Sequence, residues 1–224
     1  NTGVIALNFH DLVDDHLGTL LSNAPISLPP GATYDHIVSN TAMATVTNTA
    51  TWTGADSAGG FAVNDTIPYN FEDISGTGTA VPLGDDEVSL ALPMGFTFDY
   101  FGVNYTDAYI SSNGFLTFLP GQSNGCCSGQ PIPTAGSPDA IIAAWWEDLY
   151  PPGGGSIQYQ TLGVAPNRYF IAQYTNLPHF SSGNPVTMQV KLFEGTNVIE
   201  VHYQDAPSDS GTHSAGVENE TGTV

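Results

Sequence analysis

The only two cysteines of this 224-residue chain, Cys126 and Cys127, are neighbours in the Gly- and Pro-rich stretch SNGCCSGQPIP. Paired cysteines serve in structural zinc sites, as reactive thiolates or in disulfides. A zinc site needs four nitrogen or sulfur ligands, usually with two residues between paired cysteines. These two cysteines are adjacent, and the sequence around them contains no further ligands of that kind. A reactive thiol needs nearby positive charge to lower its pKa, and the formal net charge of −20 disfavours a thiolate.

The remaining interpretation is a disulfide between adjacent residues, formed in an oxidising compartment. Adjacent Cα atoms are about 3.8 Å apart, which is below the usual disulfide range of about 4.4–6.8 Å. The ring therefore needs a tight turn, and Gly125 and Gly129 on either side of the pair supply conformational freedom. Two free thiols, or links to another chain, are the alternatives to this predicted vicinal disulfide.

Carboxylates are the second group with the potential for chemistry. Asp85, Asp86 and Glu87 follow Pro-Leu-Gly in one predicted loop. Charges of one sign this close repel, and either a bound Ca²⁺ ion or solvent exposure would relieve the repulsion. Asp148 either orders the Gly-rich turn that follows it or binds Ca²⁺. These four acids are the candidate calcium ligands.

The sequence WWED, residues 145–148, also contains the residue types of a glycosidase, which uses two carboxylates with aromatic rings beside them. In a strand, Trp145 and Glu147 share one face while Trp146 and Asp148 share the other. One tryptophan is then a core residue, and the acids cap the strand end. The chain has no G-x-S-x-G nucleophile motif and no H-E-x-x-H metal motif. We therefore predict a protein that is not an enzyme.

Exposed aromatic rings form a third candidate site, because two or three of them are enough to stack on a sugar. Most aromatic residues of the chain fall in predicted strands and should be buried. Tyr105 and Tyr150 lie near predicted turns and are the candidate binding residues. The ligand that such a site would take is a polysaccharide.

The charge balance restricts the partners of the chain. It has 22 acidic residues, and Arg168 and Lys191 are its only Lys or Arg. Nucleic acid is excluded, because phosphate binding needs clustered basic residues. No apolar run of about 18 residues is present, so no membrane insertion is expected. An acidic, well-solvated surface is typical of extracellular or cell-surface proteins.

The elements that position these residues are predicted to be β-strands. Helix signals are almost absent, and short β-rich runs alternate with Gly, Pro, Asn and Asp. From Val186 to Leu192 apolar and polar residues alternate, which predicts a strand with one buried face, and the run 197–205 completes a hairpin with it. The fold class is therefore all-β, an antiparallel β-sandwich of jelly-roll or Ig-like type. The predicted strands cover residues 44–54, 95–102, 108–119, 156–163, 168–177, 186–195 and 197–205.

A change in composition marks a domain boundary. The stretch GADSAGGFAVND, residues 54–65, separates a Thr-, Asn- and Ala-rich part from one rich in aromatic residues and Gly. We predict a small β domain at residues 1–56 and a larger β-sandwich at residues 57–224.

The segment LPPGATYDHIVSNTAMATVTNTATWTG, residues 28–54, resembles the second half of the Ig-like conserved-repeat domains of bacterial surface proteins. Leu28 to Gly31 matches the turn of that family, and Val46 to Gly54 matches its final strand. The opening Asn-Thr-Gly also matches, but in the family it follows an early Thr- and Val-rich strand that this chain lacks. The resemblance implies a small, incomplete Ig-like sandwich.

A sheet without one of its strands exposes unpaired backbone groups and an apolar groove. A strand from a second copy would fill this missing-strand groove, and head-to-tail addition of that kind produces filaments. The alternative is that the chain is part of a longer multidomain protein whose other domains are its partners.

The motifs of residues 65–224 resemble a nidogen-like, protease-associated β-sandwich module of secreted bacterial multidomain proteins. They lie at residues 73–86, 96–102, 111–118, 141–154, 165–173 and 216–222. The resemblance implies a non-catalytic extracellular module for adhesion or assembly, including a filament subunit. The alternative is an accessory carbohydrate- or protein-binding domain of a secreted hydrolase.

Overall fold

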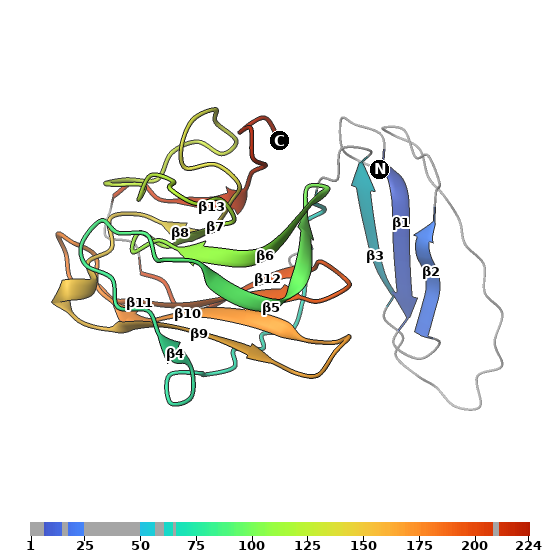
Figure 1. Cartoon of the computed structure of the whole chain (residues 1–224), viewed down its shortest axis with the longest axis horizontal. Helices are drawn as coiled ribbons and strands as arrows, with labels where there is room; N and C mark the ends of the chain where they lie inside the picture. Colours follow the sequence, from blue (N-terminus) through green and yellow to red (C-terminus); the bar gives the residue numbers. More distant parts are fainter. Residues whose placement is uncertain (1–6, 15–17, 25–49, 57–60, 65, 208–210) are drawn as a thin grey trace. The chain divides into compact units, whose positions relative to one another are not determined.

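The structure is a computed structural model, and it describes residues 7–14, 18–24, 50–56, 61–64, 66–207 and 211–224. The chain divides into two compact units, residues 1–67 and 68–224. The described residues form β-strands and one short 3₁₀ helix, Pro151–Gly153, which confirms the predicted all-β class (Figure 1). The domain boundary predicted between residues 56 and 57 adjoins residues 57–60, which lie outside the described residues.

The first unit contains a three-stranded antiparallel sheet in the order β2-β1-β3. Its strands are β1 (Leu7–Asp14), β2 (Gly18–Ala24) and β3 (Ala50–Asp56). The strand predicted at residues 44–54 is thus described from Ala50 onward. The predicted turn at residues 28–31 lies outside the described residues.

The second unit is an antiparallel β-sandwich of two five-stranded sheets, as the sequence predicted. One sheet has the order β12-β11-β10-β9-β4, and the other has the order β13-β8-β7-β6-β5 (Figure 1). The strands of the first sheet are β4 (Thr79–Ala80), β9 (Ser156–Leu162), β10 (Tyr169–Leu177), β11 (Val186–Phe193) and β12 (Ile199–Asp205). Those of the second are β5 (Leu92–Tyr100), β6 (Val103–Ile110), β7 (Phe115–Thr117), β8 (Ile141–Trp146) and β13 (Ser214–Val217).

The core between the two sheets follows from the period-2 pattern of the strands. In β5 every second residue from Leu92 to Tyr100 is buried. Tyr174 of β10 is fully buried, and its hydroxyl donates hydrogen bonds to Ser111 O at 2.9 Å and Phe115 O at 3.1 Å, so it connects the two sheets. Each large apolar side chain buried here stabilises the fold by about 1.5–3 kcal/mol.

The outer face of β10 and β11 is covered by residues 69–78, which we call the covering segment. The prediction of one buried face for β11 is wrong, because all residues from Val186 to Leu192 are buried. Polar side chains of the strands bond to the backbone of the covering segment and remain satisfied when buried. These bonds are Gln173 Oε1 to Ile74 N at 2.9 Å, Gln189 Oε1 to Glu72 N at 3.0 Å and Lys191 Nζ to Asn70 O at 2.7 Å.

A second segment, residues 119–139, packs on one face of the sheet that contains β7 and β8. Its Ile132 lies against a buried apolar cluster of the sheet. A Cβ atom at its Gly125 would lie 2.6 Å from the Phe115 ring and 2.7 Å from the Trp146 indole, so its backbone lies directly on these rings. The apolar cluster consists of Phe115, Ile141, Ala143 and Trp146. This segment contains the two cysteines.

Candidate functional site

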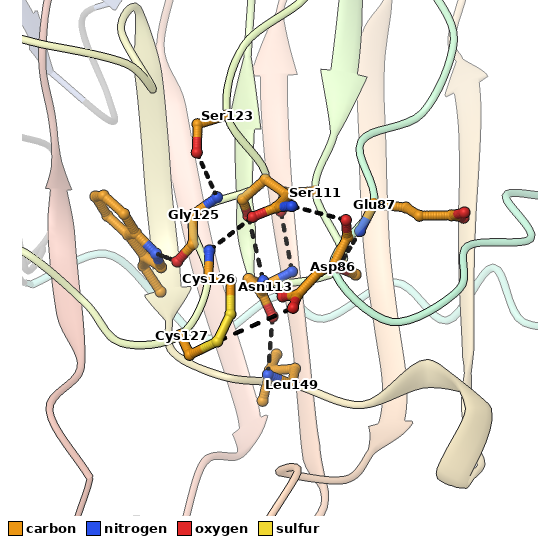
Figure 2. Close-up of a disulfide and its surroundings, with 12 residues drawn as sticks. Asp86, Glu87, Ser111, Asn113, Ser123, Gly125, Cys126, Cys127 and Leu149 are labelled. Carbon is orange, nitrogen blue, oxygen red and sulfur yellow. Dashed lines mark hydrogen bonds between the residues drawn. A yellow bond between two sulfur atoms is a disulfide. The ribbon is translucent and has the colours of Figure 1, made fainter.

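Four chain segments meet around the buried side chain of Asn113 (Figure 2). Its Nδ2 donates to Asp86 Oδ1 at 2.8 Å and to Asn124 O at 3.2 Å. Its Oδ1 accepts a hydrogen bond from Leu149 N at 3.0 Å. One side chain therefore holds together the turn that contains Asp86, its own turn between β6 and β7, the cysteine loop and the segment after β8.

The turn that presents Asn113 depends on the glycine after it. Gly114 has φ +82°, a conformation that L side chains rarely adopt. A Cβ atom there would lie 2.0 Å from Trp145 O, so the backbone of β8 approaches too closely for any other residue. Gly114 O accepts hydrogen bonds from Ala144 N and Trp145 N, at 3.2 and 3.1 Å, which fixes the turn against β8.

Three of the four candidate calcium ligands come together here. Carboxylate oxygens of Asp85, Asp86 and Asp148 lie within 4.8 Å of one another, although Asp148 is far from the other two in the sequence. Burial raises the pKa of the Asp85 carboxyl above its usual value, and the charge of Asp86 raises it further. Two carboxylates at one site thus disfavour each other's charge, which a cation would relieve. We call these three acids the Asp86 site.

Glu87, the fourth candidate ligand, is not part of this group. Its side chain is exposed, and its Oε2 accepts a hydrogen bond from Gly84 N at 2.6 Å. This carboxylate therefore closes the turn that leads to Asp85 and Asp86, because it satisfies a backbone N–H that the turn leaves unpaired.

Cys126 and Cys127 form a disulfide, as predicted, and the peptide bond between them is cis (Figure 2). Asn124 connects this loop to the Asp86 site, since its Oδ1 accepts from Cys126 N at 2.8 Å and its Nδ2 donates to Asp86 O at 2.8 Å. Cys127 Sγ lies 4.0 Å from Asp86 Oδ2. Because both sulfurs are bonded to each other, oxygen atoms are the donors that this site offers to a hard cation.

The disulfide predicts the outcome of an alkylation experiment. Protein unfolded in denaturant without a reductant should take up no iodoacetamide, because a disulfide has no thiol to react. After reduction with a dithiol, two alkyl groups should be added, and peptide mass spectrometry should place them on Cys126 and Cys127. Uptake of two groups without reductant would show two free thiols instead.

Tyr150, one of the two candidate binding residues, follows Asp148 of the Asp86 site by two residues in the chain. Its ring makes an edge-to-face contact with Phe180, with ring centroids 5.2 Å apart. Phe180 is 55% exposed, and its backbone N donates to Asp148 O at 2.9 Å. Sequence reasoning missed Phe180, although a large aromatic residue in a Pro-, Ser- and Gly-rich loop was an available signal.

Tyr105, the other candidate binding residue, lies on β6 and does not meet Tyr150. Its ring stacks on Phe118 with centroids 5.0 Å apart. Its hydroxyl donates to Glu220 Oε2 at 3.3 Å. Burial, together with the negative charge of Glu220, raises the pKa of Tyr105 to about 12. The ring contributes to packing within its own sheet rather than to the Asp86 site.

Glu147 and His179 form a buried pair that sequence reasoning also missed. Their side chains are 3% and 0% exposed, and His179 Nε2 lies 3.0 Å from Glu147 Oε2. Trp145 Nε1 lies 3.3 Å from the same His179 nitrogen, so Trp145 and Glu147 do share one side of the chain, as predicted. The pair is buried, and Glu147 directly precedes Asp148 in the chain.

Comparison with known families agrees with this architecture. The family model described as NIDO related matches residues 60–224, which is most of the chain. The chain therefore belongs to the NIDO-related family, and the predicted nidogen-like module is confirmed. Domains of this family are typical of extracellular proteins. No solved structure matches the chain.

The match begins after the segment that resembles Ig-like conserved repeats, so that resemblance stays a prediction. Within the residues that the structure describes, no helix is long and apolar enough to cross a membrane.

Proposed function

We propose that this chain is a non-catalytic module for adhesion or assembly in a larger secreted or cell-surface protein, and that the Asp86 site binds calcium at its binding surface. The observation that supports this most directly is the convergence of Asp85, Asp86 and Asp148, with oxygens within 4.8 Å, from two separate segments. Ca²⁺ takes six to eight oxygen ligands, and extracellular modules bind it with Kd values of about 10⁻⁴–10⁻³ M.

The burial of the Glu147–His179 pair supports a role without catalysis. A histidine next to a carboxylate is a common acid–base pair in enzymes, but it must reach the substrate. With both side chains at most 3% exposed, a substrate in solvent cannot approach them. The accessible groups at this site are the acids and the Tyr150–Phe180 pair, which suit binding better than proton transfer.

The calcium proposal predicts a site-specific loss of affinity. Asp85→Asn should weaken Ca²⁺ binding about tenfold, because the number of ligand charges sets the affinity of such sites. Asp205→Asn is the matched control, since Asp205 is also exposed and its substitution changes the net charge equally. Isothermal titration calorimetry measures both affinities. If both substitutions weaken Ca²⁺ binding equally, the effect comes from the net charge of the protein and not from the loss of a ligand at the Asp86 site.

The assembly part of the proposal concerns the first unit. We propose that residues 1–55 are the second half of an Ig-like repeat and that copies join by strand addition. Among the described strands of this sheet, β2 and β3 each pair only with β1, so each offers a backbone edge to an added strand. Size-exclusion chromatography with light scattering, with and without a calcium chelator, tests this. A compact monomer at micromolar concentration would contradict it and favour domains of a longer chain as partners.

A second candidate function is polysaccharide or protein binding as an accessory domain of a secreted hydrolase. The exposed Phe180 ring beside Tyr150 favours it, because exposed aromatic rings stack on sugars. The test is binding to immobilised polysaccharides. This function is supported over assembly if the parent protein binds and the Phe180→Ala variant, still folded, does not.

A further inference from the structure

Another pair of acidic side chains, Asp139 and Glu218, lies where β8 begins and β13 ends. Strand β13 pairs with β8, with Val217 opposite Ile142, and the pairing continues because Glu218 N donates to Ile141 O at 3.1 Å. Ala140 N donates in turn to Asn219 O at 3.1 Å. Asp139 directly precedes Ala140, so these bonds bring the backbone beside Asp139 next to the backbone beside Glu218.

Both carboxylates are buried at their inner oxygens. Glu218 is only 1% exposed, and its Oε2 accepts a hydrogen bond from Thr134 N at 2.9 Å. Glu218 Oε1 and Asp139 Oδ1 are both inaccessible and have no hydrogen-bond partner among the described residues. Burying a carboxylate oxygen without a partner is costly, so natural proteins pair such charges or use them to bind metals.

Among the described residues of the second unit, every basic side chain is engaged away from this pair. Arg168 and Lys191 are the only Lys or Arg of the whole chain. Arg168 Nε bonds to Glu194 Oε2 at 2.7 Å, and Lys191 Nζ bonds to Asn70 O at 2.7 Å. The histidines of the second unit are also engaged elsewhere. His179 lies against Glu147, His202 against Glu200 and His213 against the Trp145 ring.

We propose that Glu218 and Asp139 bind one Ca²⁺ ion through Glu218 Oε1 and Asp139 Oδ1. The donors are carboxylate oxygens, which select a hard cation over a transition metal. The ion neutralises a buried pair that the protein itself leaves uncompensated. Burial raises the pKa of the Glu218 carboxyl, and the charge of Asp139 raises it further, which is the repulsion that a cation removes.

Such an ion would also fix the segment that contains the disulfide. Asp139 ends residues 119–139, and its backbone O already accepts a hydrogen bond from Thr117 Oγ1 at 2.8 Å. Thr134 of the same segment donates to Glu218. An ion between Asp139 and Glu218 would therefore fasten the C-terminal end of this segment to the end of β13. This proposal does not depend on calcium at the Asp86 site.

Calcium stoichiometry in variants of the whole chain tests the proposal. Glu218→Gln keeps an oxygen for Thr134 N and nearly the same volume but removes the charge. We expect isothermal titration calorimetry to show one fewer Ca²⁺ bound than in the parent protein. Thermal unfolding should show that the calcium-dependent rise in Tm shrinks, while in chelator at pH 7 the variant melts no lower than the parent. Asp139→Asn should behave in the same way and provides a second route.

The control separates the two sites. Asp85→Asn should leave the ion at Glu218 in place. This variant should therefore still bind one Ca²⁺, even if its Asp86 site binds none, and adding Glu218→Gln to it should abolish that binding. The proposal is overturned if Glu218→Gln and Asp139→Asn bind as many ions as the parent. In that case a higher Tm of both variants, with and without calcium, would show that the repulsion within the pair destabilises the protein and that no ion relieves it.

Discussion

Gly114→Ala should destabilise the second unit by roughly 4 kcal/mol or more, which is in the range of exceptional single substitutions. The new Cβ atom would lie 2.0 Å from Trp145 O and 2.8 Å from Trp145 C, both of which are backbone atoms that cannot rotate away. Relief would require the turn to move off β8, which would break the hydrogen bonds that Gly114 O accepts from Ala144 N and Trp145 N. Denaturant unfolding, followed by tryptophan fluorescence, measures the loss.

Gly121→Ala is the matched control for this substitution. Gly121 also has a positive φ of +70°, but no atom lies within 4 Å of the position of its Cβ. Its substitution should cost only the conformational penalty of about 1–2 kcal/mol. If both variants lose the same stability, the close approach between Gly114 and Trp145 is not what determines the effect.

Asn113→Ala has the second-largest expected effect, a loss of roughly 3 kcal/mol. The substitution removes the partner of Leu149 N and the donor to Asp86 Oδ1 and Asn124 O, all within or next to the buried interior. Leaving one buried polar group unsatisfied costs about 1–3 kcal/mol, and here more than one is affected. The free energy of unfolding from urea titration measures the change.

Asn104→Ala is the corresponding control, because Asn104 is exposed on β6. An exposed substitution of this kind should change stability by no more than about 0.5 kcal/mol. Similar losses in the two variants would contradict the role of Asn113 as the junction of four segments. A further expected difference is that only Asn113→Ala weakens calcium binding, since Asn113 holds Asp86 in position.

Local patterns in the sequence were sufficient for the disulfide and for many of the strands, but not for β1, β2, β4 and β13. The run 108–119, predicted as one strand, is wrong in that the turn at Asn113 and Gly114 divides it into the end of β6 and β7. Period-2 alternation between Gly, Pro and Asn breaks predicts strands because side chains of a strand alternate between faces. The adjacent cysteines could be interpreted by elimination, because the −20 charge and the missing metal ligands are properties of the sequence itself. Both inferences need only residues that lie close together along the chain.

The candidate site could be predicted in part. Asp85, Asp86 and Asp148 were identified as acids of the right type, but their convergence depends on how β8 lies against the turn before β5. Glu87, although adjacent to Asp86, bonds to Gly84 N instead, which depends on the local turn geometry. Tyr105 could not be separated from Tyr150 by sequence, because exposure near a turn depends on which neighbour packs on the ring.

The sequence by itself determined that this chain is an acidic, all-β protein with a vicinal disulfide, since alternation and composition are local quantities. Only the tertiary structure decided what covers each strand. Gln189 and Lys191 form the polar face of β11, and they are buried because the covering segment, distant in the sequence, supplies backbone partners. The uncompensated pair of Asp139 and Glu218 likewise emerges only from strand register. The sequence shows which groups of a polar residue can donate, accept or carry charge. Long-range packing decides whether those groups contact water, a protein partner or an ion.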